Sequence, residues 1–329
     1  MICQGCLQEK NISSSQYCAA CRRSLFDNRD VSNLLSFNKQ EYIDFRVSSG
    51  GRFSISGLQP KILLKLEGKE LTPAIKGGKY ILKSAPLSYN IPRFTEDVPA
   101  NEHLTMQIAR QIFKINAAKN CFIRLKSNEP AYLTKRFDRQ KDGTGVPQED
   151  FCQLMNISKE THGDDYKYQF SYESIANIIK RYCVASIVEL EKFFKLLLFN
   201  YVLSNGDAHL KNFSLQQSSH GDYLIAPAYD LLCTALHFPN ETRTALDLFD
   251  DHETKHYLDN GFYTGACFIQ FGKKIRIRDT FVNKEIARYF EKESDVKKMV
   301  ECSQLSSEAK KEYMERYKDR LIAISIGRQ

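Results

Sequence analysis

The residues best suited to chemistry lie in one short segment past the middle of the chain. Asp207 is followed five residues later by Asn212, and Asp230 comes eighteen residues after Asn212. A carboxylate can accept the proton of an attacking hydroxyl, while an amide oxygen and a second carboxylate are ligands that suit Mg²⁺. The spacing therefore predicts phosphoryl transfer from ATP, with Asp207 as proton acceptor and Asn212 and Asp230 as magnesium ligands.

A lysine and a glutamate upstream could orient the ATP phosphates. Residues 79–83 have strand character and end in Lys83, and nineteen residues later Glu102 opens an apolar-periodic stretch that predicts a helix. Kinase N-lobes pair a strand lysine with a helix glutamate in this way. A lysine and a glutamate at this spacing are, taken alone, more often surface charges. Their position ahead of Asp207 and Asn212 favours the ATP-orienting role.

A glycine-containing segment at residues 50–61 leads into a predicted strand at 62–66. Backbone N–H groups in such a loop can bind phosphates. The pattern is neither G-x-x-x-x-G-K-[ST] nor G-x-G-x-x-G, so by itself it favours a hairpin turn. The order of the motifs that follow favours a phosphate loop. Its candidate residues are Ser54, Ser56, Gly57, Gln59 and Lys61.

Four of the ten cysteines form two CxxC pairs, Cys3 with Cys6 and Cys18 with Cys21. Each pair directs two thiolates at one centre, and two pairs produce the closed tetrahedral site typical of structural Zn²⁺. A redox or iron–sulfur role and unligated thiols are the alternatives. Four protein ligands leave no open position, so the metal is expected to stabilise a small knuckle and do no chemistry.

Composition limits the class of protein. A chain of 329 residues with 42% hydrophobic content can form one two-lobed domain or two ordinary ones. The charge of +7 arises from 47 basic and 40 acidic residues, which favours an ordinary solvated surface over a nucleic-acid patch. Single cysteines elsewhere, no leader-like start and no long apolar run predict a cytoplasmic protein without a membrane segment.

Several further segments carry local predictions. Residues 273–278 alternate basic and apolar side chains and predict a strand with one solvent-exposed face. Residues 161–170 resemble a metal-binding loop in composition, but irregular spacing favours a surface loop. His252 and His256 are four residues apart, and no third metal ligand is evident. Residues 306–323 predict an amphipathic C-terminal helix.

The motifs together resemble a known family. In order, seven blocks resemble the signature blocks of the HipA-like serine/threonine kinases, the toxins of bacterial toxin–antitoxin systems: residues 54–61, 81–83, 101–103, 136–139, 148–153, 205–214 and 228–231. The resemblance covers about residues 50 to 325. It implies an α+β, two-lobed protein-kinase-like fold, with a strand-rich N-lobe and a helical C-lobe, and MgATP-dependent phosphorylation of a protein.

The predicted organisation has four parts. A four-cysteine, zinc-ribbon-like knuckle occupies residues 1–27 and a connector residues 28–49. The kinase N-lobe with its phosphate loop follows at 50–148, and the helical C-lobe with the catalytic and metal-binding loops at 149–329.

The resemblance also implies roles for single residues. Asp207 corresponds to the catalytic base, Asn212 and Asp230 to the magnesium ligands and Lys83 to the ATP-phosphate lysine, with Lys135 and Phe137 near the adenine. His209 and Lys211 lie in the catalytic loop, where orienting Asp207 and the γ-phosphate or a structural role both fit. Ser54 occupies the family's autophosphorylation position and Ser56 is a second candidate. A phosphate there would repel ATP and act as an off-switch.

The short segment ahead of the phosphate loop resembles the HipT branch of the family, although the cysteine knuckle departs from that pattern. That branch implies a HipS-like small protein and a HipB-like DNA-binding antitoxin as partners. The chain is then expected to contact nucleic acid only indirectly, through the antitoxin. The family's targets are aminoacyl-tRNA synthetases, glutamyl for HipA and tryptophanyl for HipT.

Two other classes stay open. Choline- and aminoglycoside-type small-molecule kinases use a similar Asp-x-x-x-x-Asn loop, but with a His-Gly-Asp order where this chain has Asn205, Gly206 and Asp207. A catalytically silent binding module would tether partners through the knuckle. Detectable ATP turnover separates that module from both kinds of enzyme.

Overall fold

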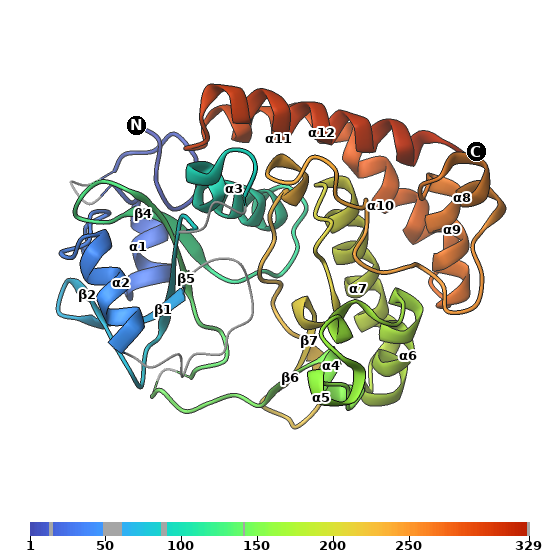
Figure 1. Cartoon of the computed structure of the whole chain (residues 1–329), viewed down its shortest axis with the longest axis horizontal. Coiled ribbons are helices and arrows are strands. Elements are labelled where there is room, and N and C mark those ends of the chain that lie inside the picture. Colours follow the sequence, from blue (N-terminus) through green and yellow to red (C-terminus); the bar gives the residue numbers. More distant parts are fainter. Residues whose placement is uncertain (13–15, 49–60, 87–90, 141, 328–329) are drawn as a thin grey trace.

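The protein has two lobes (Figure 1). The structure is a computed structural model and describes residues 1–12, 16–48, 61–86, 91–140 and 142–327. The first lobe is built on an antiparallel sheet, and the second consists mainly of helices. This arrangement confirms the α+β, two-lobed fold predicted from the sequence. Four candidate residues of the predicted phosphate loop lie outside the described residues: Ser54, Ser56, Gly57 and Gln59.

The N-lobe sheet has the strand order β2-β1-β3-β5-β4 and antiparallel pairing throughout. The strands are β1 (Lys61–Glu67), β2 (Glu70–Pro73), β3 (Tyr80–Ser84), β4 (Asn120–Arg124) and β5 (Pro130–Lys135). Lys61 of β1 lies opposite Lys83 of β3, and Lys83 lies opposite Tyr132 of β5. The register therefore places two lysines side by side at one end of the sheet.

The two faces of this sheet contact different partners because side chains alternate along a strand. Phe122 and Tyr132 pack in the cluster that contains helix α3 (Val98–Gln111). Cys121 and Leu133 face the other way, toward a cluster with the helices α1 (Ala19–Phe26) and α2 (Lys39–Ser48). The sheet is thus covered on both faces, which fixes the direction of Lys83.

The helical lobe surrounds α7 (Ser186–Val202), which is buried over most of its length. A small sheet of the strands β6 (Gln148–Asp150), β7 (Ser214–Gln217) and β8 (Tyr223–Ile225) lies beside it. The other helices are α4 (Phe151–Leu154), α5 (Lys159–His162), α6 (Tyr172–Tyr182), α8 (Lys255–Asn260), α9 (Gly265–Lys274), α10 (Asp279–Glu291), α11 (Glu293–Glu301) and α12 (Ser307–Ser325). Short 3-10 turns are η1 (Thr95–Asp97), η2 (Tyr166–Tyr168), η3 (Leu210–Asn212) and η4 (Thr234–Leu236).

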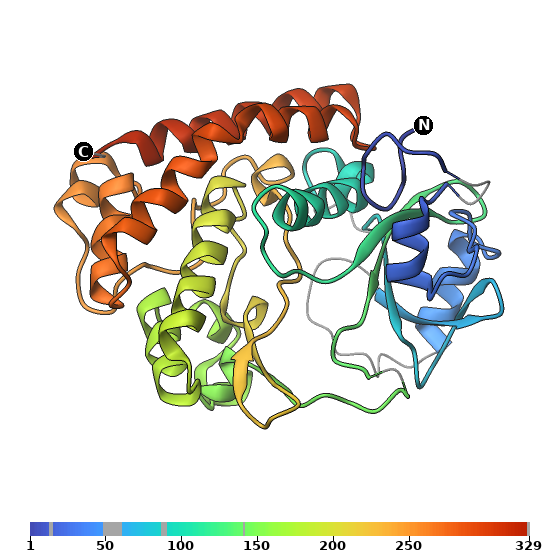
Figure 2. The same ribbon diagram turned by 180° about the vertical axis from the view of Figure 1, so that it is seen from behind.

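The C-terminal helix α12 joins the two lobes. It runs along one side of the molecule in both views (Figures 1 and 2). Tyr313 is buried and its hydroxyl is 2.9 Å from that of Thr105 on α3, while α12 also contacts α7 and η4. The predicted amphipathic tail helix is therefore observed, and it fixes α3 against the helical lobe.

One local prediction was wrong. Residues 273–278 form the end of α9 and a turn, not a strand: Ile275 and Ile277 are buried on either side of Arg276, whose φ of 68° reverses the chain. Tertiary packing outweighs the weak periodicity of this segment. Within the range predicted as a connector, residues 28–49, the structure has the helix α2, which buries Tyr42 against the sheet.

The cysteine knuckle shares its core with the N-lobe. Cys3, Tyr17, Cys18 and Cys21 pack in the same cluster as the buried residues of β1, β3, β4 and β5. The first residues are therefore an integral part of the sheet lobe.

Candidate active site

The segment that carries Asp207 leaves α7 through a tight reversal. Ser204 has a φ of 55°, and Asn205 anchors the loop because its amide nitrogen donates to Asn200 Oδ1 at 2.9 Å and its side-chain oxygen accepts from Asp207 N at 3.2 Å. Asn212 then donates to the carbonyl of Asp207 at 2.8 Å. These bonds fix Asp207 and Asn212 relative to each other.

Gly206 is required by a close approach of two backbone segments. A Cβ atom at this position would lie 2.4 Å from the carbonyl oxygen of Thr242. Any side chain here would push the segment that follows Asp230 away from the catalytic loop.

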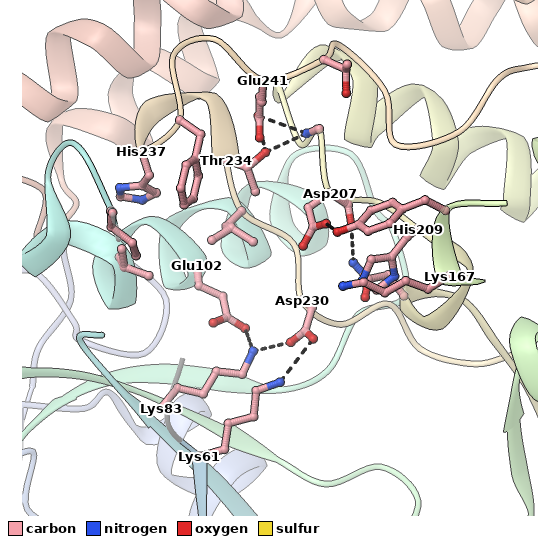
Figure 3. A pocket seen from close by; sticks show the side chains of 18 residues that line it. Lys61, Lys83, Glu102, Lys167, Asp207, His209, Asp230, Thr234, His237 and Glu241 are labelled. Carbon is pink, nitrogen blue, oxygen red and sulfur yellow. Dashed lines mark hydrogen bonds and ion pairs between the residues drawn. The ribbon is translucent and has the colours of Figure 1, made fainter. Parts of the chain in front are cut away.

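A charged cluster joins the sheet lobe to the helical lobe. Lys83 Nζ lies 2.5 Å from Glu102 Oε1 and also bonds Asp230, while Lys61 Nζ lies 3.6 Å from the second oxygen of Asp230 (Figure 3). The structure thus brings together the strand lysine, the helix glutamate and the aspartate of three distant motifs. Asp230 has a φ of 53°, a left-handed conformation that the surrounding contacts must maintain.

The charges in this cluster are strongly coupled. Burial alone would lower the pKa of Lys83, but Asp230 and Glu102 raise it well above its ordinary value. Burial raises the pKa of Glu102 to about 7, against the opposing effect of Lys83. Burial would raise the pKa of Asp230 as well, but Lys61 and Lys83 hold it well below its usual range. Asp230 is therefore an anion whose charge two lysines neutralise.

Two cavities meet at this cluster. The larger has a volume of about 920 Å³ and the smaller about 650 Å³, and both are lined by Lys61, Lys83, Asn212 and Asp230. Ile81, Ala118 and Phe137 add apolar wall to the larger cavity, while Asp207 lines only the smaller. The volumes are in the range of small-molecule sites. The shared wall separates a cavity with apolar lining from one that contains the candidate base.

The larger cavity also receives the residues expected near an adenine. Lys135 lines it and forms an ion pair with Asp27 of 2.9 Å. Phe137 lies across from Tyr229, with ring centroids 5.9 Å apart. Lys135 is thus held at the rim by a residue of the N-terminal region, and Phe137 forms part of an aromatic wall.

Tyr168 is a site residue that the sequence did not single out. Its hydroxyl donates to Asp207 Oδ1 at 2.6 Å, and its ring packs edge-on against His209 with centroids 5.2 Å apart. It comes from η2, within the stretch predicted as a plain surface loop. Tyr168 therefore occupies one carboxylate oxygen of the candidate base.

Thr234 and Glu241 form a second contact that sequence reasoning missed. Gly206 N donates to Thr234 Oγ1 at 2.7 Å and Thr234 Oγ1 donates to Glu241 Oε1 (Figure 3). Burial raises the pKa of Glu241 to about 7. Neither residue belongs to a spacing motif, so only tertiary structure could reveal that they hold the backbone beside Asp207.

His209 and Lys211 lie in the same loop but have different neighbours. Burial lowers the pKa of His209 to about 4, so the ring is neutral at pH 7, and its Nδ1 has no hydrogen-bond partner among the described residues. Lys211 forms an ion pair of 2.6 Å with Asp150 and lines the larger cavity. His209 therefore lies beside the candidate base, whereas Lys211 is bound to a carboxylate of β6.

The donor set at the shared wall fits Mg²⁺. The carboxylate oxygens of Asp230 are held by Lys83 and Lys61 in this structure and would reach a cation once the lysines turn to bound phosphates. The side-chain nitrogen of Asn212 is used by the Asp207 carbonyl, which leaves its amide oxygen for a cation. Glu102 Oε2 is also buried without a partner among the described residues. This set of hard oxygen donors suits Mg²⁺, and the unpartnered Glu102 oxygen can accept from a donor or a cation.

The four knuckle cysteines converge as well. Their sulfur atoms all lie within 4.8 Å of one another, and they form the only such His/Cys/Asp/Glu group found among the described residues. His252 and His256 belong to no such group in that part of the chain. The arrangement is compatible with a bound metal ion.

Comparison with known proteins identifies the family. The family model described as the HipA-like C-terminal domain matches residues 53–311. The chain therefore belongs to the HipA-like C-terminal domain family.

Curated relatives agree with this assignment. The chain is 29% identical over 307 residues to the protein named "Putative kinase" of Haemophilus influenzae, a match that covers 88% of this chain and 87% of that one. It is 32% identical over 195 residues to "Putative kinase Y4mE" of Sinorhizobium fredii and 24% identical over 223 residues to the serine/threonine-protein kinase toxin HipA of Shewanella oneidensis. These two matches cover 56% and 61% of this chain but only 43% and 48% of the longer relatives.

Solved structures show the same fold. HipA of Shewanella oneidensis, determined in a complex with HipB and operator DNA, matches with a TM-score of 0.60 at 20% identity over 82% of this chain and 64% of that one. The Helicobacter pylori proinflammatory kinase CtkA matches with a TM-score of 0.54 at 16% identity, covering 83% of this chain and 94% of that one. Among the described residues, no helix has the length and apolar character needed to span a bilayer.

Proposed function

We propose that the chain is an MgATP-dependent serine/threonine protein kinase that acts as the toxin of a toxin–antitoxin system. The observation that carries this proposal is the cluster of Lys83, Glu102 and Asp230 in the wall between two cavities, with Asp207 on one side of it. Three elements far apart in sequence supply these groups. Membership of a family with kinase relatives supports the same conclusion.

In this proposal ATP enters the larger cavity. Phe137 and Ile81 contact the adenine, with Lys135 at the rim, and the phosphates extend toward Lys83 and Lys61. Gly57 and Gln59, outside the described residues, belong to the loop proposed to cover those phosphates. Glu102 keeps Lys83 directed at them.

The acceptor serine enters the smaller cavity. Asp207 accepts the proton of its hydroxyl while the hydroxyl oxygen attacks the γ-phosphorus, and the bond to the β,γ-bridging oxygen breaks. Asn212 and Asp230 would hold Mg²⁺, which when bound offsets charge on the phosphates. Lys83 and Lys61 offset the remaining charge, and His209 and Lys211 position the catalytic loop. The hydroxyl of Tyr168 leaves Asp207 Oδ1 when the acceptor hydroxyl arrives.

The biological role follows from the resemblance to HipA-like toxins. The proposed acceptor is a serine of an aminoacyl-tRNA synthetase, tryptophanyl or glutamyl, and its modification would inhibit translation in the cytoplasm. Ser54 or Ser56 would be the autophosphorylation site. A HipS-like small protein and a HipB-like DNA-binding antitoxin are the proposed partners.

A structural Zn²⁺ at Cys3, Cys6, Cys18 and Cys21 completes the proposal. Four thiolates at about 2.3 Å from a central zinc lie about 3.8 Å from one another. The Cys6 and Cys18 sulfur atoms are 4.0 Å apart. This near match supports a closed tetrahedral site.

Phosphorylation of purified tryptophanyl- and glutamyl-tRNA synthetases in the presence of MgATP tests the substrate. We expect peptide mass spectrometry to find one phosphoserine in one of the two enzymes, produced by the wild-type chain and not by Asp207→Ala. Transfer to a small alcohol or aminoglycoside and to neither synthetase would overturn the protein-kinase assignment.

A further inference from the structure

The first cysteine turn is built around a close approach that only glycine allows. A Cβ atom on Gly5 would lie 2.7 Å from Cys21 Sγ. Cys3 Sγ accepts hydrogen bonds from Gly5 N at 3.4 Å and from Cys18 N at 3.2 Å. The two CxxC turns are therefore locked onto each other around the sulfur atoms.

The same turn contacts α3, the helix that carries Glu102. The carbonyl of Cys6 accepts from Gln111 Nε2 at 2.8 Å, and Gln8 donates to Gln111 Oε1 at 2.5 Å. The carbonyl of Gly5 lies 3.3 Å from His103 Nε2, which must carry the proton because a carbonyl oxygen can only accept. His103 is the neighbour of Glu102 on the helix.

Burial strengthens this contact. His103 is 1% exposed and burial lowers the pKa of its ring to about 4, so it binds Gly5 as a neutral donor. Leu7, which directly follows Cys6, is 2% exposed and packs in the cluster that contains the buried residues of α3. The turn thus contributes both hydrogen bonds and apolar contact to the helix.

The opposite side of the knuckle is bonded to the sheet. Phe122 N of the edge strand β4 donates to the carbonyl of Gln4 at 2.9 Å, and Tyr17 Oη donates to the carbonyl of Phe122 at 2.9 Å. The knuckle therefore covers a sheet edge with one side and holds α3 with the other. The knuckle thus links the edge strand to the helix, in addition to the packing of α3 on the sheet and on α12.

We propose that the four-cysteine site is a metal-dependent clamp, in which a bound thiophilic divalent cation, Zn²⁺, holds α3 so that Glu102 stays paired with Lys83. The cation links the two CxxC turns to each other. The backbone of the first turn then binds the side chains of His103 and Gln111, and these bonds keep α3, with Glu102, in place. Loss of the metal frees the first turn from the second and loosens α3. The consequence for ATP rests on the proposed kinase function, but the metal and helix steps do not.

The metal content of the chain and the protection of α3 from hydrogen exchange can both be measured without an activity assay. The full chain should contain one zinc per molecule by elemental analysis, and cobalt substitution should produce the absorption of a tetrahedral thiolate site. The double variant Cys18→Ser, Cys21→Ser should lose the metal and show faster hydrogen exchange in α3, with exchange in α7 unchanged. Cys302→Ser, which alters a cysteine outside the cluster, is the matched control and should behave as wild type.

A second variant separates the clamp from the metal. Gln111→Ala removes the bonds to Cys6 and Gln8 but no cysteine, so it should keep zinc and still show faster exchange in α3. In both variants the Kd for MgATP should rise about tenfold, the effect of weakening one hydrogen bond to a charged group.

The results that would refute the clamp differ from the result that would refute the kinase assignment. A purified chain that binds neither zinc nor cobalt would overturn the proposal, as would a metal-free double variant with unchanged exchange in α3. Gln111→Ala with unchanged α3 exchange would refute the clamp even if the cysteine variant failed to fold. A wild-type chain that binds zinc, protects α3 and does not bind ATP would refute the kinase assignment instead.

Discussion

Replacing Glu102 by glutamine isolates the contribution of one buried charge. Glu102 is 1% exposed and Lys83 4%, and their Oε1 and Nζ atoms are 2.5 Å apart. Glutamine keeps the shape and one acceptor oxygen but carries no charge. Asp230 also bonds Lys83, so Glu102→Gln leaves the lysine one carboxylate and the fold is expected to survive.

The effect on catalysis should be larger than the effect on folding. In the proposed mechanism Asp230 would hold Mg²⁺, which leaves Glu102 as the carboxylate that keeps Lys83 on the phosphates. A hydrogen bond to a charged group contributes about 1.5–3 kcal/mol. At about 1.4 kcal/mol per factor of ten, the kcat/KM for ATP should fall roughly 10- to 100-fold.

The pH dependence gives the prediction a second signature. Because burial raises the pKa of Glu102 to about 7, the carboxylate becomes protonated as pH falls through 7 and loses its charge pairing with Lys83. Wild-type kcat/KM should therefore fall below pH 7, and the part of this fall due to Glu102 should be absent in Glu102→Gln. The raised pKa also means that wild-type folding loses stability as pH rises from the unfolded value toward 7, which the variant should not.

Steady-state ADP release at varied ATP concentration, measured on both sides of pH 7, provides the assay. Glu96→Gln changes an exposed glutamate six residues earlier and serves as the matched control. A Glu102→Gln variant with the kcat/KM and the pH profile of wild type would refute the assigned role of the ion pair.

Three further perturbations test neighbouring contacts. Tyr168→Phe removes the hydroxyl from Asp207 Oδ1, so the KM for the protein acceptor should fall about 3- to 10-fold with the KM for ATP unchanged; an unchanged acceptor KM would contradict this competition. Glu241→Gln should gain stability relative to wild type as pH rises from about 4.5 to 7, because the buried carboxyl with a pKa of about 7 must ionise over that range; parallel melting curves would contradict it. Asp230→Asn should slow magnesium-dependent transfer by about 100-fold or more in single-turnover assays, and a smaller loss would argue against its metal role.

Spacing motifs could predict the parts of the site that chemistry restricts most. The spacing of Asp207, Asn212 and Asp230 singled them out as the candidate base and magnesium ligands, and the structure places all three around one cavity. Lys83 and Glu102 required an additional assumption, that a strand and a helix would bring them together. Lys61 was predicted only as part of the phosphate loop; the register of β1 and β3 places it beside Lys83, and it forms an ion pair with Asp230.

The contacts of Tyr168 and Glu241 could not be predicted from the sequence. Tyr168 comes from a polar stretch whose composition indicates only a surface loop, and its contact with Asp207 depends on the fold of η2. Glu241 has no periodic or motif context, and it acts through Thr234 on the backbone of Gly206. Such contacts join segments with no fixed spacing, so no pattern along the chain can reveal them.

The N-terminal region shows the same limit. The CxxC spacing predicted the convergence of Cys3 and its three partners, because sulfur geometry restricts the spacing. It did not predict that the knuckle would share the sheet core or that Gln111 would bond its first turn. Those contacts depend on where the sheet edge and α3 lie.

Intact-mass and peptide mass spectrometry of the purified chain after incubation with MgATP would show directly whether the protein is a kinase that modifies itself. We expect phosphate on Ser54 or Ser56 of the wild-type chain and none on Asp207→Ala, with both proteins folded by circular dichroism. Equal phosphorylation of the Asp207→Ala chain would contradict the assignment of Asp207 as the base and, with it, the proposed kinase mechanism.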